Sequence, residues 1–165
     1  MIELTPLDRL EIIELQSIYA WGIDGKDGSL FAQAFTEDIE TDYGHLGKMQ
    51  GLDFFTRWMD AFHSPFGTTH HLIANPWVAV EGDGVVFRSY VIANMVCKGC
   101  PGGDLLSGGG HYVDRVVRTD AGWRIRSREV TNHWRSGNLE IFEVGKEALA
   151  NAGLVQSDLS PTARS

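Results

Sequence analysis

The feature that most constrains the fold of this chain is a change of residue pattern near His63. Apolar residues recur at helical spacing before it, and long strand-like segments separated by glycine-containing turns follow it. Helices followed by a run of antiparallel strands are typical of an α+β fold. The expected strands reach roughly 10 to 14 residues, against a usual length of about 5 to 6. Because such strands curve strongly, we expect a cone-shaped barrel. In it a curved mixed or antiparallel sheet wraps around the N-terminal helices and leaves an apolar pocket inside.

Three helices are expected in the N-terminal part of the chain. Thr5 suits an N-cap and Pro6 the first helical position, and this first helix should end near Gly22. A short second helix should start near Asp27, and a third should span 51–63. We expect one apolar stripe of the first helix to face the core: Leu7, Leu10, Ile13, Ile18 and Trp21.

The second half of the chain predicts strands joined by hairpins. Turn signals at 81–84 and 119–122 each suit a tight connection. A last helix is expected over 139–151, and we interpret 1–155 as one domain followed by a disordered tail at 156–165. The expected strands are 38–43, 68–75, 77–81, 85–97, 105–119 and 123–134.

The charge balance excludes some classes of partner. Fourteen Lys and Arg residues stand against 22 Asp and Glu residues, which gives a net charge of −8. No Lys/Arg stripe could follow a phosphate backbone, so we expect neither nucleic acid nor an anionic membrane as a partner. No apolar run approaches the roughly 20 residues of a spanning helix, and the N-terminus has no secretory signal pattern. We therefore expect a cytoplasmic protein.

Cys97 and Cys100 form a single C-x-x-C pair in a glycine-rich segment. Such a pair can be half of a zinc site or a redox pair, but the second zinc pair is missing and no βαβ context supports thioredoxin-like chemistry. No H-x-H or H-x-x-x-H spacing indicates a metal site either. We interpret the two cysteines as loop thiols and expect no metal site.

Two adjacent histidines, His70 and His71, lie in one expected strand, so their side chains should point to opposite faces. The inward histidine is a candidate general acid/base in an apolar cavity, or else a core histidine bonded to a backbone carbonyl. Asp24, beside two glycines, can be a turn residue, a carboxylate that orients His71, or a base that removes a substrate proton itself. Tyr19 and Tyr43 can polarise a substrate carbonyl or simply belong to the core.

The expected strand 105–119 places Tyr112 and Asp114 on one face, where burial without partners would be costly. The next strand alternates arginine with apolar or small residues, which is the pattern of a half-buried strand. We expect its arginine face to meet solvent or an interface: Arg124, Arg126 and Arg128.

Four motifs carry a family resemblance: Tyr19-x4-Asp24, Asp42-Tyr43, the segment 69–75 and the segment 110–125. Together they resemble the SnoaL-like branch of the nuclear-transport-factor-2-like superfamily, and within it scytalone dehydratase and bile-acid dehydratase. The resemblance runs from about residue 7 to residue 148. It implies a cone-shaped barrel with an internal site that uses neither a cofactor nor a metal.

The resemblance also implies roles for particular residues. His71 matches the catalytic histidine of those dehydratases and Asp24 the aspartate paired with it. Tyr19 matches a tyrosine of the bile-acid enzyme, and Tyr43 matches the scytalone dehydratase tyrosine that holds a water against the substrate carbonyl. This chain differs from those dehydratases at residues of the pocket wall, which select the substrate. Ile23 replaces a tyrosine, the position of a second catalytic histidine falls near Asn94, and Gly110 and Tyr112 stand where scytalone dehydratase has a serine and an asparagine.

These observations predict a cofactor-independent dehydratase or isomerase that removes a proton from a hydrophobic cyclic or aromatic small molecule. The alternative is a non-enzymatic ligand-binding or assembly module, such as the small subunit of an oxygenase. The distance between His71 and Asp24 distinguishes the two hypotheses. We expect a homodimer or homotrimer, because a curved open sheet leaves an apolar face exposed. The candidate pocket residues are Tyr112, Asp114, Phe55, Trp58 and Asn94.

Overall fold

The structure is a computed structural model and describes residues 2–155. The tail expected at 156–165 lies outside these residues. The elements are α1 (Pro6–Asp24), α2 (Gly28–Ala32), β1 (Phe35–Asp42), η1 (Gly44–Leu46), β2 (Lys48–Gln50), α3 (Leu52–His63), β3 (Thr68–Glu81), β4 (Gly84–Val96), β5 (Leu105–Thr119), β6 (Gly122–Gly137) and α4 (Glu140–Asn151).

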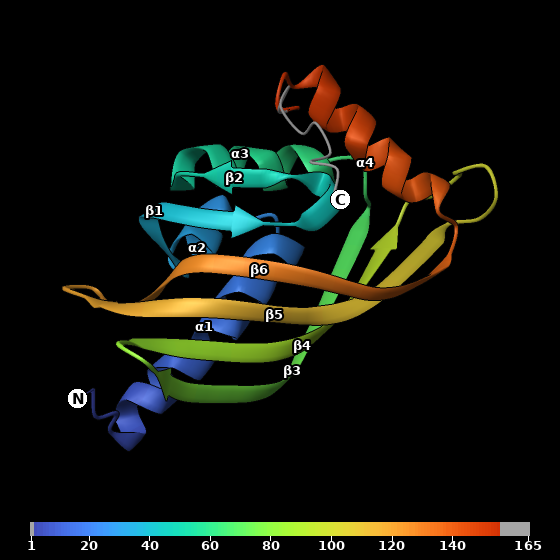
Figure 1. The fold of residues 1–165 in the computed structure, drawn as a ribbon. Helices are drawn as coiled ribbons and strands as arrows, with labels where there is room; N and C mark the ends of the chain where they lie inside the picture. The colour runs from blue at the N-terminus through green and yellow to red at the C-terminus, as the bar shows by residue number, and fades with distance from the viewer. Residues whose placement is uncertain (1, 156–165) are drawn as a thin grey trace, which may run out of the picture.

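The strands form one six-stranded mixed sheet in the order β2-β1-β6-β5-β4-β3. Only the β1–β6 pair is parallel, and every other neighbouring pair is antiparallel. Figure 1 shows the four long strands bent together, with α1 behind them and with α3 beside α4. The predicted α+β architecture with a curved sheet is therefore confirmed, and the sheet is open rather than a closed barrel.

The two strands expected at 68–75 and 77–81 are one strand, β3. In its pairing with β4, Ala74 lies opposite Tyr90 and Trp77 lies opposite Arg88. Asn75 and Pro76, between them, form an irregularity that does not end the strand. Asn75 has φ = 55°, a left-handed conformation that asparagine tolerates better than most residues. The prediction was wrong because a proline at 76 signals a break, whereas an edge strand accommodates it.

The first helix turns a different stripe to the core from the one predicted. Thr5 is the N-cap as expected and forms a capping box with Asp8, but Leu7, Leu10 and Trp21 are 62%, 65% and 74% exposed. Gly22 shows why: a Cβ there would lie 2.5 Å from the backbone nitrogen of Phe31, so α2 rests directly on this face. α1 has two apolar stripes, and packing selects the second: Ile12, Leu15, Tyr19 and Ile23.

The arginine face predicted for β6 is confirmed for Arg126, which is exposed, but is wrong for Arg128, because the strand contains a β-bulge. Arg115 of β5 pairs with Ser127 and Val116 pairs with Ile125, which leaves Arg126 as an extra residue. One extra residue reverses the alternation of side chains. Ile125 points inward before the bulge and Arg128 points inward after it, where its side chain is 1% exposed. The exposed arginine predicted at this position is therefore a core residue.

The loop between β4 and β5 differs from its prediction as well. Cys97 and Cys100 form a disulfide across this loop, with Cα atoms 5.9 Å apart, and so are not free thiols. Gly99, between them, has φ = 78°, which a glycine adopts without strain. No helix within residues 2–155 is long and apolar enough to cross a membrane.

Candidate active site

A histidine and an aspartate from two distant segments meet at the wall of an internal pocket. Asp24 is the last residue of α1, and His71 lies on β3 with its side chain inward, whereas His70 is exposed. His71 Nδ1 lies 2.7 Å from Asp24 Oδ1, and the backbone N–H of His71 donates to Asp24 Oδ2 at 2.7 Å. Thr69 Oγ1 donates to Oδ1 at 2.9 Å. Three donors therefore hold one carboxylate in place.

The protonation state of the pair follows from these contacts. Burial by itself would raise the pKa of Asp24, but the side-chain and backbone hydrogen bonds from His71, with Thr69, lower it below its ordinary value. An ionised Asp24 only accepts hydrogen bonds, so the proton of neutral His71 resides on Nδ1. Nε2 of His71 is then the basic nitrogen, and His71 lines the pocket.

Three tyrosines from three elements converge beside this pair. The hydroxyl of Tyr19 on α1 lies 3.4 Å from that of Tyr43, just after β1, and 3.5 Å from that of Tyr112 on β5. The rings of Tyr19 and His71 meet edge to face at 6.0 Å. Burial is the main cause that raises the pKa of all three phenols above the ordinary value. They are therefore neutral hydroxyls that can donate hydrogen bonds.

A buried ion pair packs against two of the tyrosine rings. Arg128 Nε and Nη2 each donate to a carboxylate oxygen of Asp114 at 2.8 Å, and both side chains are essentially inaccessible. Burial opposes the charged form of Arg128, but Asp114 holds its pKa well above the ordinary value. The guanidinium carbon lies 4.3 Å from the ring centre of Tyr19 and 4.2 Å from that of Tyr112. The cation thus stacks on two of the phenol rings and fixes their positions.

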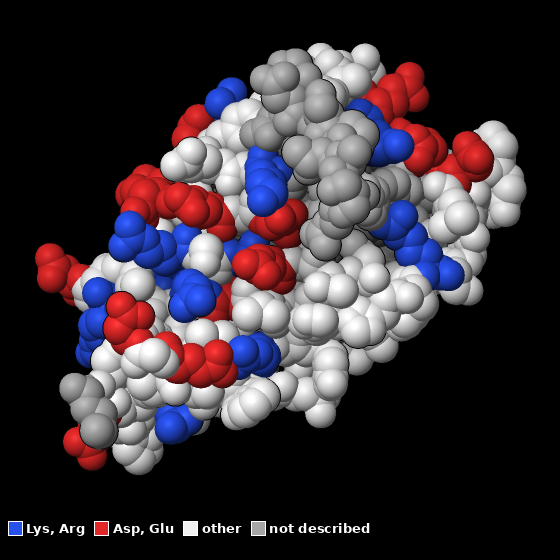
Figure 2. All heavy atoms as spheres, in the orientation of Figure 1, with Lys and Arg blue, Asp and Glu red and all other residues white. Residues whose placement is uncertain are grey.

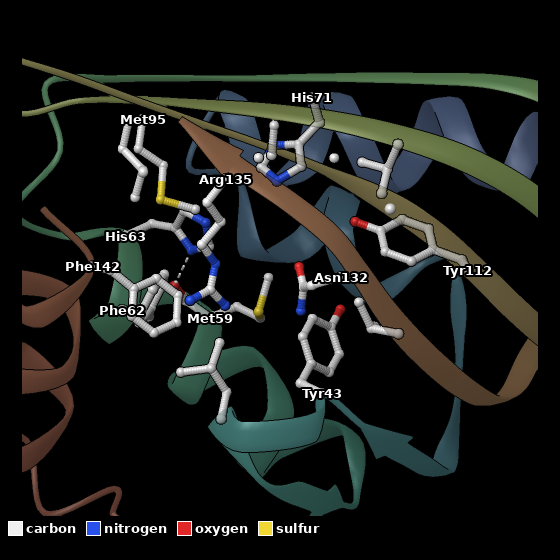
Figure 3. Close-up of a pocket in the computed structure, with 18 of the residues that line it drawn as sticks. Tyr43, Met59, Phe62, His63, His71, Met95, Tyr112, Asn132, Arg135 and Phe142 are labelled. Atoms are coloured by element: carbon white, nitrogen blue, oxygen red, sulfur yellow. Dashed lines mark hydrogen bonds between the residues drawn. The ribbon is translucent and has the colours of Figure 1, made fainter. Parts of the chain in front are cut away.

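The pocket itself is mainly apolar. Side chains from α3, β4, β5, β6 and α4 enclose it, and Figure 3 shows His71, Tyr112, Tyr43 and Asn132 around one space. Three glycines of β5 line the cavity, Gly108, Gly109 and Gly110, and a Cβ at Gly110 would clash with the backbone oxygen of Thr131. The apolar lining consists of Leu46, Trp58, Met59, Phe62, Val91, Ala93, Met95, Leu106, Val130 and Phe142.

The polar rim of the pocket comes from the far end of β6. Arg135 Nη2 lies 2.5 Å from His45 Nε2, and its guanidinium lies 4.3 Å from the ring centre of Phe142. A second bulge places these residues, because Gly110 pairs with Asn132 while Gly109 pairs with Trp134. Asn132 and Arg135 are three positions apart and would point to opposite faces of a regular strand, but because of the bulge both line the pocket.

The structure brings most of the predicted site residues together. His71, Tyr19, Tyr43, Tyr112 and Trp58 line the pocket, and Asp24 contacts His71 from behind.

Three other predicted pocket residues lie elsewhere. Asp114 is enclosed with Arg128 below the tyrosines. Phe55 packs in the aromatic core, 5.2 Å from both Phe31 and Phe35 between ring centres. Asn94 points to the other face of β4, where it accepts a hydrogen bond from Ser107, while its neighbours Ala93 and Met95 line the pocket.

Sequence reasoning missed three polar residues of this region, namely His63, Arg128 and Arg135. His63 is the last residue of α3, 5% exposed, and its ring lies 5.9 Å from the ring of His71. One sequence signal could have revealed Arg128: inward apolar residues change from odd to even positions between Ile125 and Val130, as a bulge requires. The position of His63 depends on how α3 packs against the sheet, which no local pattern reports.

Taken together, the site offers a base, neutral hydroxyl donors and an apolar space. Removal of a carbon-bound proton requires a base within reach, and tyrosine hydroxyls can stabilise the negative oxygen that results. Within residues 2–155, no group of three or more His, Cys, Asp or Glu side chains has the arrangement of a metal site.

Comparison with known proteins places the chain in a family. Residues 5–129 match the SnoaL-like domain. The uncharacterized protein Rv2910c of Mycobacterium tuberculosis is 34% identical over 125 residues, which covers 75% of this chain and 84% of the relative.

Solved structures agree with the fold. A candidate aromatic ring hydroxylase from Novosphingobium aromaticivorans is 28% identical, with a TM-score of 0.74 over 85% of this chain and 99% of that chain. A candidate scytalone dehydratase from the same organism is 21% identical, with a TM-score of 0.71 over 80% of this chain and 88% of that chain. A hexachlorocyclohexane dehydrochlorinase, LinA type 2, is 18% identical, with a TM-score of 0.71 over 81% and 93%. The chain therefore belongs to the SnoaL-like domain family and has the NTF2-like fold predicted for it.

Proposed function

We propose that this protein is a cofactor-independent lyase or isomerase that removes a proton from a hydrophobic cyclic or aromatic substrate. One observation carries the proposal: His71 Nδ1 is bonded to Asp24 at 2.7 Å, and the same ring lines an apolar pocket. A carboxylate that fixes the tautomer of a histidine makes its other nitrogen a positioned base. A simple binding pocket would have no need of such a pair.

The reaction starts when His71 Nε2 takes a proton from the carbon next to a substrate carbonyl. The C–H electron pair forms an enolate, and a hydroxyl of the tyrosine cluster (Tyr19, Tyr43 and Tyr112) donates a hydrogen bond to its oxygen. In a dehydration the enolate collapses, the carbon–oxygen bond at the next carbon breaks, and His71 returns its proton to the leaving hydroxide as water. In an isomerisation the proton returns to a different carbon.

Two of the structural relatives are named for related chemistry. The candidate scytalone dehydratase and the dehydrochlorinase both carry names of elimination enzymes on the same fold. Elimination of water or of hydrogen chloride requires a base that removes a proton from carbon. The names therefore support an elimination or proton-transfer reaction here, while the pocket lining of this chain determines its own substrate.

The first experiment uses two probes with purified protein. 1-Tetralone in deuterium oxide reports proton abstraction through exchange at C2, followed by NMR. 3-Hydroxy-1-tetralone reports complete elimination, because loss of water and tautomerisation give the fluorescent product 1-naphthol. We expect catalysed exchange that is lost in His71→Asn and kept in His70→Asn, the matched control on the opposite face of β3. Equal rates in the wild type and in His71→Asn would refute the proposal.

A second candidate function is that of a ligand-binding or assembly module. Its support is the relative named as a candidate aromatic ring hydroxylase and the exposed apolar residues on the outer face of the sheet. A module of this kind would give no exchange with 1-tetralone in any variant, and it would bind a stable partner chain. The exchange experiment therefore separates the two candidates.

A further inference from the structure

The pocket contains a second histidine that the proposed reaction leaves unused. His63 ends α3, is 5% exposed, and packs edge to face against Phe62 and Phe66. Its ring centre lies 5.9 Å from that of His71, and both residues line the same cavity. Figure 3 shows its ring beside the pocket, with a dashed line from one nitrogen to the backbone oxygen of Met59.

The hydrogen bond to Met59 determines the tautomer of His63. Nδ1 lies 2.9 Å from the carbonyl oxygen of Met59, and a carbonyl oxygen only accepts hydrogen bonds. Nδ1 therefore carries the ring proton, and Nε2 presents a lone pair. Nε2 is buried and has no hydrogen-bond partner among the described residues. A buried acceptor without a donor is unfavourable, so this nitrogen needs a donor from elsewhere.

Nearby cationic side chains are engaged with other acceptors. Lys26 Nζ donates to the backbone oxygen of Phe66 at 2.8 Å, and Arg135 Nη2 lies against His45. Neither of these side chains is hydrogen-bonded to His63 Nε2. The donor that His63 lacks can therefore be supplied by a ligand in the pocket.

His63 and His71 share a tautomer but differ in what they can do. A carboxylate stands behind His71 and stabilises the imidazolium that forms when it takes a proton. The group bonded to Nδ1 of His63 is only the neutral carbonyl of Met59. Burial, reinforced by the charge that His71 can carry, lowers the pKa of His63 to about 3. His63 therefore remains neutral near pH 7 and accepts a hydrogen bond rather than a proton.

We propose that His63 Nε2 accepts a hydrogen bond from a hydroxyl group of the substrate, so that the pocket selects apolar rings that carry an O–H donor close to the carbon from which His71 removes a proton. The inference rests on the proposed function and narrows its substrate class to alcohols and phenols. A hydroxyl has one hydrogen and two lone pairs. When its hydrogen points to His63, a lone pair remains free to take the proton that His71 has removed. His63 thus acts as a positioning and specificity-determining residue.

The test uses two ligands of nearly equal size, 2-naphthol and 2-methylnaphthalene, with the intact protein. Only the first carries a donor. We expect the wild type to bind 2-naphthol about tenfold more tightly, the usual effect of one well-placed hydrogen bond. In protein labelled with ¹⁵N at histidine, the Nε2 resonance of His63 should shift with 2-naphthol and stay in place with 2-methylnaphthalene.

Two variants separate this role from a merely structural one. His63→Asn keeps an amide near Nδ1 but has no acceptor at the position of Nε2, so the preference for 2-naphthol should disappear. His63→Gln places an oxygen near Nε2 and should restore the preference to within about threefold. Affinity for 2-methylnaphthalene should be similar in all three proteins.

Several results would overturn the inference. These are equal affinity of the wild type for both ligands, an unchanged Nε2 resonance, or no binding of either ligand. The NMR measurement on the wild type stands even if a variant fails to fold. None of these readouts depends on turnover, so catalysed exchange with 1-tetralone together with an unchanged resonance would reject the role of His63 and keep the proposed function.

Discussion

A single carboxylate, that of Asp24, holds both the backbone and the side chain of His71. Oδ2 accepts the backbone N–H at 2.7 Å, and Oδ1 lies 2.7 Å from the ring Nδ1. The contact joins the end of α1 to the first part of β3, so it ties the orientation of the ring to the packing of the helix on the sheet. The base is therefore positioned by the fold itself.

Asp24→Asn should abolish most of the proton abstraction. Three donors converge on this carboxylate, from His71 twice and from Thr69, whereas an asparagine offers one oxygen and one N–H₂ group. At least one donor then faces another donor, and the ring loses its fixed tautomer. We expect exchange at C2 of 1-tetralone to slow by about 10²–10⁴-fold. Exchange at the wild-type rate in folded Asp24→Asn would contradict this role.

Tyr19→Phe should reduce elimination with little loss of stability. The Tyr19 hydroxyl lies between those of Tyr43 and Tyr112, and its ring, which packs on Arg128, is retained in phenylalanine. Loss of one donor to a developing oxyanion commonly costs about 10²–10³-fold in turnover. The decrease should appear in kcat for 3-hydroxy-1-tetralone. Tyr90→Phe, which removes an exposed hydroxyl on the outer face, is the matched control and should leave kcat unchanged.

Removal of only one partner of the Arg128–Asp114 pair should destabilise the folded protein. Arg128→Met leaves a buried carboxylate without its partner, and we expect the free energy of unfolding to fall by about 3–5 kcal/mol. Arg128→Met combined with Asp114→Leu removes both charges and should recover part of the loss. Urea unfolding measures each variant. A double variant less stable than the Arg128→Met single variant would contradict the prediction, because removal of the unpaired carboxylate would then bring no recovery.

His63 should make the protein sensitive to acid. Burial lowers its pKa to about 3 in the folded state, against an ordinary value near 6.5. Between these values the unfolded chain binds a proton that the folded chain does not, so stability rises with pH across this window and is lost as the pH falls. We expect a slope of up to about 1 kcal/mol per pH unit from this residue. His63→Phe should flatten the unfolding profile between pH 6.5 and 3, whereas His70→Gln, at an exposed site, should not.

The outer face of the sheet should mediate self-association. Figure 2 shows charged side chains on the left and at the upper right of the view, and a largely uncharged area in the lower centre, over the long strands. Large apolar residues are exposed on this face: Leu72, Tyr90, Ile92 and Trp134. We expect light scattering to report a dimer or trimer that Ile92→Asp converts to a monomer. Leu10→Asp, at an exposed apolar site on α1, should leave the mass unchanged. A monomeric wild type would contradict the prediction.

The sequence by itself determined those features that depend on local periodicity. The succession of N-terminal helices and later long strands, the two hairpin turns and the opposite directions of His70 and His71 all follow from spacing along one segment. Strand parity is a property of neighbouring residues, so it predicted that one of the two histidines faces inward. The family resemblance indicated that this histidine is His71. The motifs around Tyr19 and Asp24 also indicated the family, because their spacing lies within one helix.

Only the tertiary structure decided the features that depend on contacts between segments. The bulge at Arg126 reverses the alternation of β6 and buries Arg128, although local alternation predicted exposure. The approach of α2 at Gly22 selects which stripe of α1 is buried. The meeting of His63 with His71 depends on how α3 packs against β3. In each case the free energy comes from burying surface between elements far apart in the chain, which local sequence patterns do not record.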